Sequence, residues 1–197
     1  MASPPPDVTG LLAALTSELD RRLLPFMLIG GQAVLLHGLP RFTADVDVTL
    51  AVGPAALGEL LAACDALALT PIAPPAESLE SFVRRTFVLP ARHLASGVRV
   101  DFIFSTTAYE AAAVARATRV PLGGAAVPFA TAEDLLIHKL FAGRPRDVED
   151  AEGVVRRQAA RLDWSYLERW VGEFGAVPGR EGMPAALARL KALAGLS

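Results

Sequence analysis

Two aspartates, Asp45 and Asp47, stand one residue apart in an apolar stretch of the chain. The alternation of residue types there predicts a strand, whose other face would carry Val46, Val48 and Leu50 into a core. Neighbouring carboxylates repel each other unless a cation lies between them. Mg²⁺ prefers oxygen ligands and is commonly bound together with phosphates. The pair therefore indicates a metal and phosphate site, although a lone Asp-x-Asp motif more often closes a turn or faces solvent.

A pair of glycines, Gly30 and Gly31, follows the apolar run 26–29, which predicts a buried strand that ends in a tight turn. Residues 32–39 then have helical spacing, and Pro40 ends the helix. Glycine lets the backbone come close to a ligand, and the N–H groups at the start of a helix bind phosphate well. The glycine pair is therefore a candidate phosphate-binding element.

A third acid, Asp101, lies in the apolar segment 98–104. In the strand predicted there, Asp101 shares a face with Arg99 and Ile103, and the opposite face is apolar (Val98, Val100, Phe102 and Phe104). A carboxylate in so apolar a strand is costly unless it has a partner, which indicates that Asp101 has a function.

These elements, in this order, resemble the signature of the nucleotidyltransferases of the DNA polymerase beta superfamily. The motif Arg41-Phe42-Thr43-x-Asp45-x-Asp47 is similar to the branch of AbiEii-type toxins and minimal nucleotidyltransferases. The resemblance extends to a helix with Lys139 and to the Arg-Asp-x-x-Asp element at 146–150, and it covers residues 26–150. It implies an α+β protein with the polymerase-beta-type nucleotidyltransferase fold, in which helices flank a mixed β-sheet and a short helical tail follows.

The resemblance also implies a role for each residue of the site. Asp45, Asp47 and Asp101 would bind Mg²⁺ or Mn²⁺, and Asp101 would hold a second metal ion or act as the base for the acceptor hydroxyl. The predicted catalytic residues are Asp45, Asp47, Asp101, Lys139 and Asp147. The predicted nucleotide-binding residues are Gly30, Gly31, Arg41, Thr43 and Lys139.

Some of these residues have an alternative interpretation. Arg41 and Thr43 would hold a phosphate or the sugar, or else Arg41 is a loop arginine paired with Asp45. Lys139 would contact the triphosphate, or else its apolar stem is buried while its ammonium group reaches solvent.

The residues around Lys139 leave further alternatives open. Asp147 and Asp150 share a helix face, so they would orient Lys139, assist the base, or act as first-turn acids favourable to the helix dipole. His138 lines the site as a polar group or, as we favour, lies at the surface. The basic patch Arg156, Arg157 and Arg161 contacts RNA or, as we favour, forms a solvated helix face.

Several local patterns predict the remaining structure. Thr9 is a plausible cap for the first amphipathic helix, and residues 119–129 predict a hairpin around Gly123-Gly124. Residues 86–89 predict a strand, and 90–97 predict a hairpin-like connection. Residues 78–85 fit a short helix or the approach to a strand.

Composition limits the class of protein. The chain has 197 residues, a net charge of −2 and one cysteine, Cys64, so it has no general attraction for nucleic acid and no internal disulfide. Neither a signal peptide nor a membrane-spanning apolar run is evident, which predicts a cytoplasmic protein without a membrane partner. We expect a flexible Pro-rich leader (1–8), a nucleotidyltransferase domain (9–160) and a C-terminal helical segment packed on it (161–197).

The predicted function is that of a metal-dependent nucleotidyltransferase, which moves a nucleoside monophosphate from a nucleoside triphosphate to an acceptor hydroxyl and releases pyrophosphate. The acceptor is RNA, a protein or a small molecule. The resemblance also implies a possible toxin with an antitoxin protein as partner. The alternative is a catalytically inactive nucleotide-binding or regulatory module that retains the fold.

Overall fold

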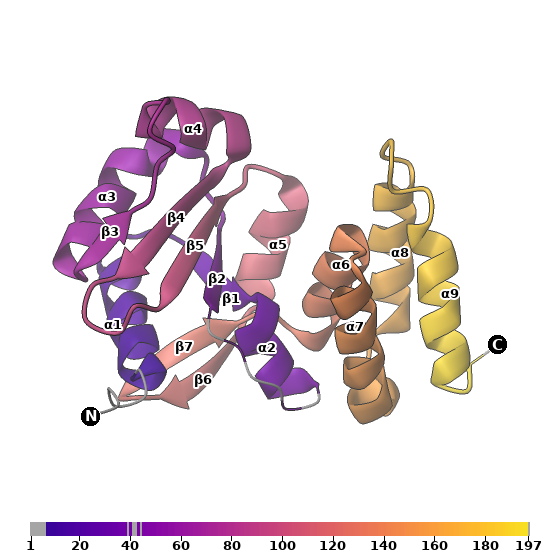
Figure 1. Cartoon of the computed structure of the whole chain (residues 1–197). Helices are drawn as coiled ribbons and strands as arrows, with labels where there is room; N and C mark the ends of the chain where they lie inside the picture. Colours follow the sequence, from indigo (N-terminus) through magenta and orange to yellow (C-terminus); the bar gives the residue numbers. More distant parts are fainter. Residues whose placement is uncertain (1–6, 39, 41–42, 44, 197) are drawn as a thin grey trace. The chain divides into compact units, whose positions relative to one another are not determined.

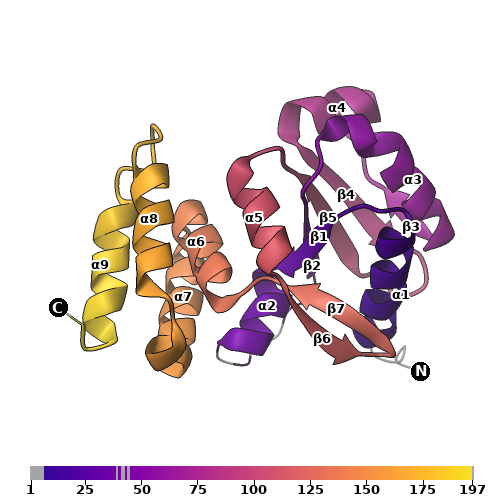
Figure 2. The ribbon, with the colours of Figure 1, turned by 180° about the vertical axis from the view of Figure 1, so that it is seen from behind.

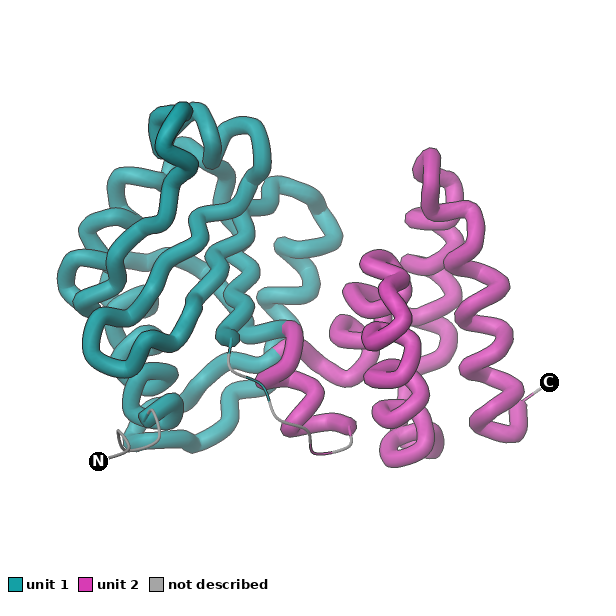
Figure 3. Tube along the Cα trace, in the orientation of Figure 1, with its two compact units in different colours: residues 1–29, 43–129 teal, residues 30–42, 130–197 magenta. Residues whose placement is uncertain are grey.

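The computed structural model describes residues 7–38, 40, 43 and 45–196. The chain divides into two compact units, shown in different colours in Figure 3. Residues 1–29 and 43–129 form the sheet unit, and residues 30–42 and 130–197 form the helical unit. In the part of the chain that the structure describes, no helix is long and apolar enough to cross a membrane.

The sheet unit contains one mixed sheet with the strand order β3-β4-β5-β2-β1-β7-β6 (Figure 1). The pairs β2–β5 and β1–β7 are parallel, and the other neighbours are antiparallel. The mixed sheet with its flanking helices confirms the predicted α+β architecture. The strands are β1 (Phe26–Ile29), β2 (Asp45–Leu50), β3 (Leu69–Pro71), β4 (Val88–His93), β5 (Arg99–Phe104), β6 (Thr118–Leu122) and β7 (Ala125–Phe129).

Helices α1 and α3 lie on the same side of this sheet, the side nearer the viewer in Figure 2. Each buries an apolar stripe, as expected of an amphipathic helix on a core. The helices of the sheet unit are α1 (Val8–Arg21), the 3₁₀ turn η1 (Pro54–Ala56), α3 (Leu57–Ala66), α4 (Leu79–Thr86) and α5 (Ala108–Arg116).

The two central parallel strands, β2 and β5, alternate in burial as the sequence pattern predicts. Their apolar residues, Val46, Val48 and Leu50 on β2 and Val100, Phe102 and Phe104 on β5, are all nearly inaccessible to solvent. On the opposite face Asp45 is exposed, and Asp47 and Asp101 are half-buried. Burial of the apolar face therefore decides which way the carboxylates point.

The helical unit buries its own apolar core. Helix α6 supplies Leu135, Leu136 and Ile137, and it packs against α2, α7, α8 and α9. The described helices of this unit are α2 (Gly30–His37), α6 (Ala132–Ala142), α7 (Pro145–Gln158), the 3₁₀ turn η2 (Ala159–Arg161), α8 (Trp164–Gly175) and α9 (Met183–Leu193).

Strand β4 runs through the segment that we expected to be a connection. It includes Pro90, which pairs with Asp101 of β5. The pairing of β3 with β4 ends at Pro71, which lies opposite Ala91. No residue of β3 therefore needs a hydrogen bond from the N–H that Pro90 lacks. The carbonyl of Pro90 still accepts a hydrogen bond from the N–H of Ile72 at 2.8 Å.

One helix cap differs from the expectation based on the sequence, and another decides between two expectations that the sequence left open. Asp7, not Thr9, caps α1, because its carboxylate accepts a hydrogen bond from the N–H of Gly10 at 2.8 Å. Ser78 caps α4, so the undecided segment 78–85 is a helix. The predicted hairpin at Gly123-Gly124 is confirmed, and both glycines have the positive φ that a tight hairpin turn requires.

The end of α1 gives a stability prediction. Leu23 has a φ of +56° and is 87% exposed, so it carries the strain of a left-handed backbone with little packing in return. Because Asn tolerates this conformation, we expect Leu23→Asn to raise the free energy of unfolding by about 0.5–1 kcal/mol. Urea denaturation measures it. Leu23→Ala is the control, because it removes the same apolar side chain without supplying the amide group through which Asn tolerates this conformation. An Asn variant no more stable than the Ala variant would contradict the prediction.

Candidate functional site

The parallel register of β2 and β5 brings two of the predicted site residues together. Asp47 pairs with Asp101, and Asp45 pairs with Arg99. Residues paired in this way point to the same face of the sheet, so the three acids lie on one face with Arg99 among them. Like charges directly opposite each other on adjacent strands destabilise a sheet, so this arrangement requires a cation.

Arg99 supplies that positive charge within the sheet itself. Its Nε donates hydrogen bonds to both carboxylate oxygens of Asp101, at 2.9 and 3.1 Å. These bonds raise the pKa of Arg99, and the charges of Asp101, Asp45 and Asp47 add to the effect. The sequence alone placed Arg99 on this face without a role. The signal that identifies it is a cation two residues before an acid, on the same face of a strand.

The three carboxylates fit a divalent cation in residue type and strand register. Among the described residues, however, no three His, Cys, Asp or Glu side chains stand close enough to hold a metal ion together. The carboxylate of Asp101 is turned to Arg99. A metal ion held by all three acids would therefore compete with Arg99 for Asp101.

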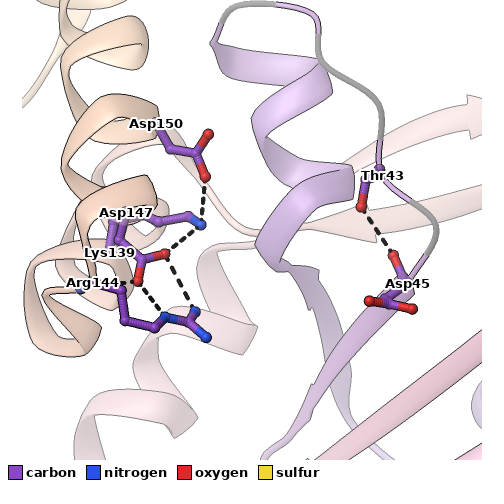
Figure 4. A network of polar contacts seen from close by, with 6 residues as sticks. All are labelled: Thr43, Asp45, Lys139, Arg144, Asp147 and Asp150. Atoms are coloured by element: carbon purple, nitrogen blue, oxygen red, sulfur yellow. Dashed lines mark hydrogen bonds and ion pairs between the residues drawn. The ribbon is translucent and has the colours of Figure 1, made fainter.

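The predicted nucleotide-binding residues beside these acids are placed as follows. The hydroxyl of Thr43 donates a long hydrogen bond, 3.4 Å, to the main-chain carbonyl of Asp45 (Figure 4). Strand β1 ends at Ile29, which pairs with Asp47, and α2 begins at the next residue, Gly30, with a φ of +60°. Arg41 lies outside the described residues.

In the helical unit, Lys139 lies in a buried cluster of charges. Its Nζ donates to Asp147 Oδ1 and to Asp150 Oδ2, both at 2.8 Å (Figure 4). The side chains of Lys139, Asp147 and Asp150 are only 7%, 2% and 5% exposed. Two of the three N–H donors of this ammonium group are thus directed at carboxylates, and the contact of Lys139 with a triphosphate stays a prediction.

Asp147 also joins this cluster to the start of α7. Its Oδ2 accepts from Arg144 Nε at 2.6 Å and from the Arg144 backbone N–H at 3.3 Å. Burial acts to raise the pKa of Asp147, but the hydrogen bonds from Arg144 and Lys139 outweigh it, and the pKa is lowered. Asp147 is thus held as a carboxylate that orients Lys139 and caps the helix.

The expectation that His138 lies at the surface is wrong for its ring. The Nε2 atom is buried, and this burial lowers the pKa of His138 to about 4. The imidazole is therefore neutral near pH 7 and adds no positive charge beside Lys139.

Comparisons with known proteins place this chain among nucleotidyltransferases. Residues 7–177 match the model of a family described as "Nucleotidyltransferase of unknown function (DUF6036)". The match confirms the predicted relation to nucleotidyltransferases, while the AbiEii-type branch stays a prediction. No protein with curated annotation is significantly similar to the chain in sequence.

Two solved structures share the fold. The solution structure of the antibiotic-resistance factor ANT(2'')-Ia is 16% identical and has a TM-score of 0.54, over 93% of this chain and 95% of that one. The crystal structure of an antigenic nucleotidyltransferase-like protein from Paracoccidioides brasiliensis is also 16% identical, with a TM-score of 0.54 over 95% of each chain.

The buried cluster gives a second stability prediction. Lys139→Met removes the cation that Lys139 supplies to Asp150, whereas Asp147 keeps its ion pair with Arg144. We therefore expect a loss of about 3–5 kcal/mol in the free energy of unfolding. The control is Lys191→Met, because Lys191 pairs at 2.6 Å with the half-exposed Glu168, a contact worth about 1 kcal/mol or less. Equal losses in the two variants, measured by urea denaturation, would show that the cluster contributes no more than a surface pair.

Proposed function

This chain belongs to the nucleotidyltransferase family whose model it matches, and we propose that it transfers a nucleoside monophosphate from a nucleoside triphosphate to an acceptor hydroxyl. The observation that carries the proposal is the pairing of Asp47 with Asp101 on parallel strands, with Asp45 on the same face. Asp45, Asp47 and Asp101 form an acidic strip, and such a strip suits a divalent cation that accompanies phosphates.

In the proposed reaction, Asp45, Asp47 and Asp101 would hold Mg²⁺ or Mn²⁺. When bound, the ion would neutralise the phosphates and lower the pKa of the acceptor hydroxyl. A carboxylate oxygen of Asp101 would accept the proton of that hydroxyl. The acceptor oxygen then forms a bond to the α-phosphorus, the bond from this phosphorus to the bridging oxygen breaks, and pyrophosphate leaves.

The remaining site residues are proposed to bind the nucleotide. Gly30 and Gly31 begin α2 and would present backbone N–H groups to the phosphates. Arg41 and Thr43 would contact a phosphate or the sugar. Lys139 would contribute positive charge to the triphosphate, with Asp147 orienting its ammonium group through their hydrogen bond.

The acceptor class stays open between RNA, a protein and a small molecule. A net charge of −2 supplies no general attraction for RNA, so we favour the other two. The proposed toxin role, with an antitoxin partner, depends only on the resemblance of the motif around Asp45 and Asp47.

One observation favours a second candidate function, a nucleotide-binding module without catalysis. The ion pair between Arg99 and Asp101 gives the acidic strip a cation of its own. Such a module would bind a nucleotide but release no pyrophosphate.

The third prediction tests the metal and nucleotide site. With Mg²⁺ and each nucleoside triphosphate in turn, we expect one nucleotide to stabilise the protein, by about 2.7 kcal/mol at a hundred times its Kd. Asp47→Asn should abolish the stabilisation because it removes a metal ligand. Thermal unfolding measures the shift, and Asp65→Asn, a change of an exposed acid on α3, is the control.

Three results would decide between the candidates. Binding with pyrophosphate release in the wild type, both lost in Asp47→Asn, supports the transferase. Binding without release for any acceptor supports the inactive module. Pyrophosphate release that survives Asp47→Asn contradicts the proposed metal site.

The fourth prediction follows from the ion pair of Arg99. Because Arg99 competes with a metal ion for Asp101, Arg99→Gln should raise the affinity for Mn²⁺ about threefold to tenfold. Mn²⁺ titration followed by electron paramagnetic resonance measures it. Arg92→Gln is the control, since Arg92 is the register partner of Arg99 on β4 but donates to the carbonyl of Gly97. Unchanged Mn²⁺ affinity in Arg99→Gln would contradict the competition.

A further inference from the structure

A cavity of about 590 Å³ lies within the helical unit, lined by α6, α7, α9 and the turn that precedes α9. Its volume is typical of sites for small molecules. The proposed reaction uses only Lys139 and Asp147 of its lining, and their charged groups bind each other. The rest of the cavity has no part in the site described above.

Exposed apolar side chains gather at this cavity. Phe141 from α6, Val148 from α7 and Leu193 from α9 are 37%, 42% and 41% exposed, and all three line it. Large apolar side chains from three helices that converge on one hollow indicate a binding surface for an apolar group.

Arg180 adds a cation that is fixed in place at the same cavity. Its guanidinium lies over the ring of Phe141, 4.3 Å from the ring centre, which limits its movement. One of its terminal nitrogens donates to the neighbouring carbonyl of Gly179 at 3.0 Å. Its Nε is buried, and no described residue accepts a hydrogen bond from it. A buried donor without a partner is costly, so this atom favours an acceptor from a ligand.

The other charges of the lining leave positive charge in excess. Arg156 pairs with Glu152 at 2.8 Å, and Lys139 pairs with Asp147, the other acid of the lining. Arg180 and Arg189 also line the cavity, and its lining includes no further acids, while the neighbouring Glu181 interacts with Arg180 from outside the lining. An anion is therefore the complementary ligand, and a cationic amphiphile would be repelled.

We propose that this cavity binds a small anionic amphiphile, in which a carboxylate, sulfonate or phosphate is joined to an apolar body. Arg180 binds the anion, because a guanidinium offers several donors in a fixed plane. Phe141, Val148 and Leu193 contact the apolar body. Arg180, Phe141, Val148 and Leu193 have no role in the proposed transfer reaction, so the test of this site does not depend on that reaction.

The fifth prediction uses two fluorescent probes that share one ring system. The anionic probe is 8-anilinonaphthalene-1-sulfonate, and the neutral probe is N-phenyl-1-naphthylamine, which lacks the sulfonate. We expect the 197-residue chain to bind the anionic probe at one site. Arg180→Gln should weaken that binding about tenfold and change the affinity for the neutral probe by less than about twofold. Fluorescence titration measures both affinities.

Two further variants make the result specific. Arg161→Gln removes the same charge from an exposed position of the helical unit outside the cavity, and it should change neither affinity. Val148→Ser should weaken both probes, because it removes apolar contact area. Circular dichroism confirms that each variant is folded. The proposal is overturned if the anionic probe does not bind, if Arg180→Gln binds it as tightly as Arg161→Gln, or if the neutral probe binds as tightly as the anionic one.

Discussion

The parallel register of β2 and β5 is the constraint on which the candidate site depends. Burial of the alternate apolar residues leaves the carboxylates no choice of face, and a slip of one residue would turn them into the core. The same register sets Asp47 directly beside Asp101. The stability of the sheet and the chemistry of its acidic face are therefore linked, since the repulsion that a metal ion would relieve exists only in the folded strands.

Two cations are suited to this acidic face, and they cannot both hold Asp101 in the same way. Arg99 binds both oxygens of Asp101 in the structure described here, on a side chain that is 46% exposed. An ion pair so open to solvent is weak, so the proposed divalent ion could displace it. Arg99 thereby stabilises the strands without a ligand, and the proposed metal ion would have to compete with it.

The charges of the helical unit follow a different physical rule. Lys139, Asp147 and Asp150 are almost fully buried, where an unpaired charge is far more costly than at the surface. Arg180, also in this unit, has a buried nitrogen that no described residue accepts from. The unit therefore combines a satisfied charge cluster, which contributes to its stability, with an arginine that is placed to receive an anion.

Local patterns in the sequence were sufficient to predict the two acid-bearing strands and the hairpin at Gly123-Gly124, because alternation and turn residues act over a few positions. The relation to nucleotidyltransferases was predicted from the resemblance of the motifs to that family. The partners of charged side chains were not predictable in the same way. That Arg99 binds Asp101 and that the ring of His138 is buried depends on rotamers and on helices distant in sequence. Periodicity in the sequence determined which face of a strand or helix each residue takes. Tertiary packing alone decided which groups meet on that face, because burial and hydrogen bonding are set by neighbours that the local pattern does not specify.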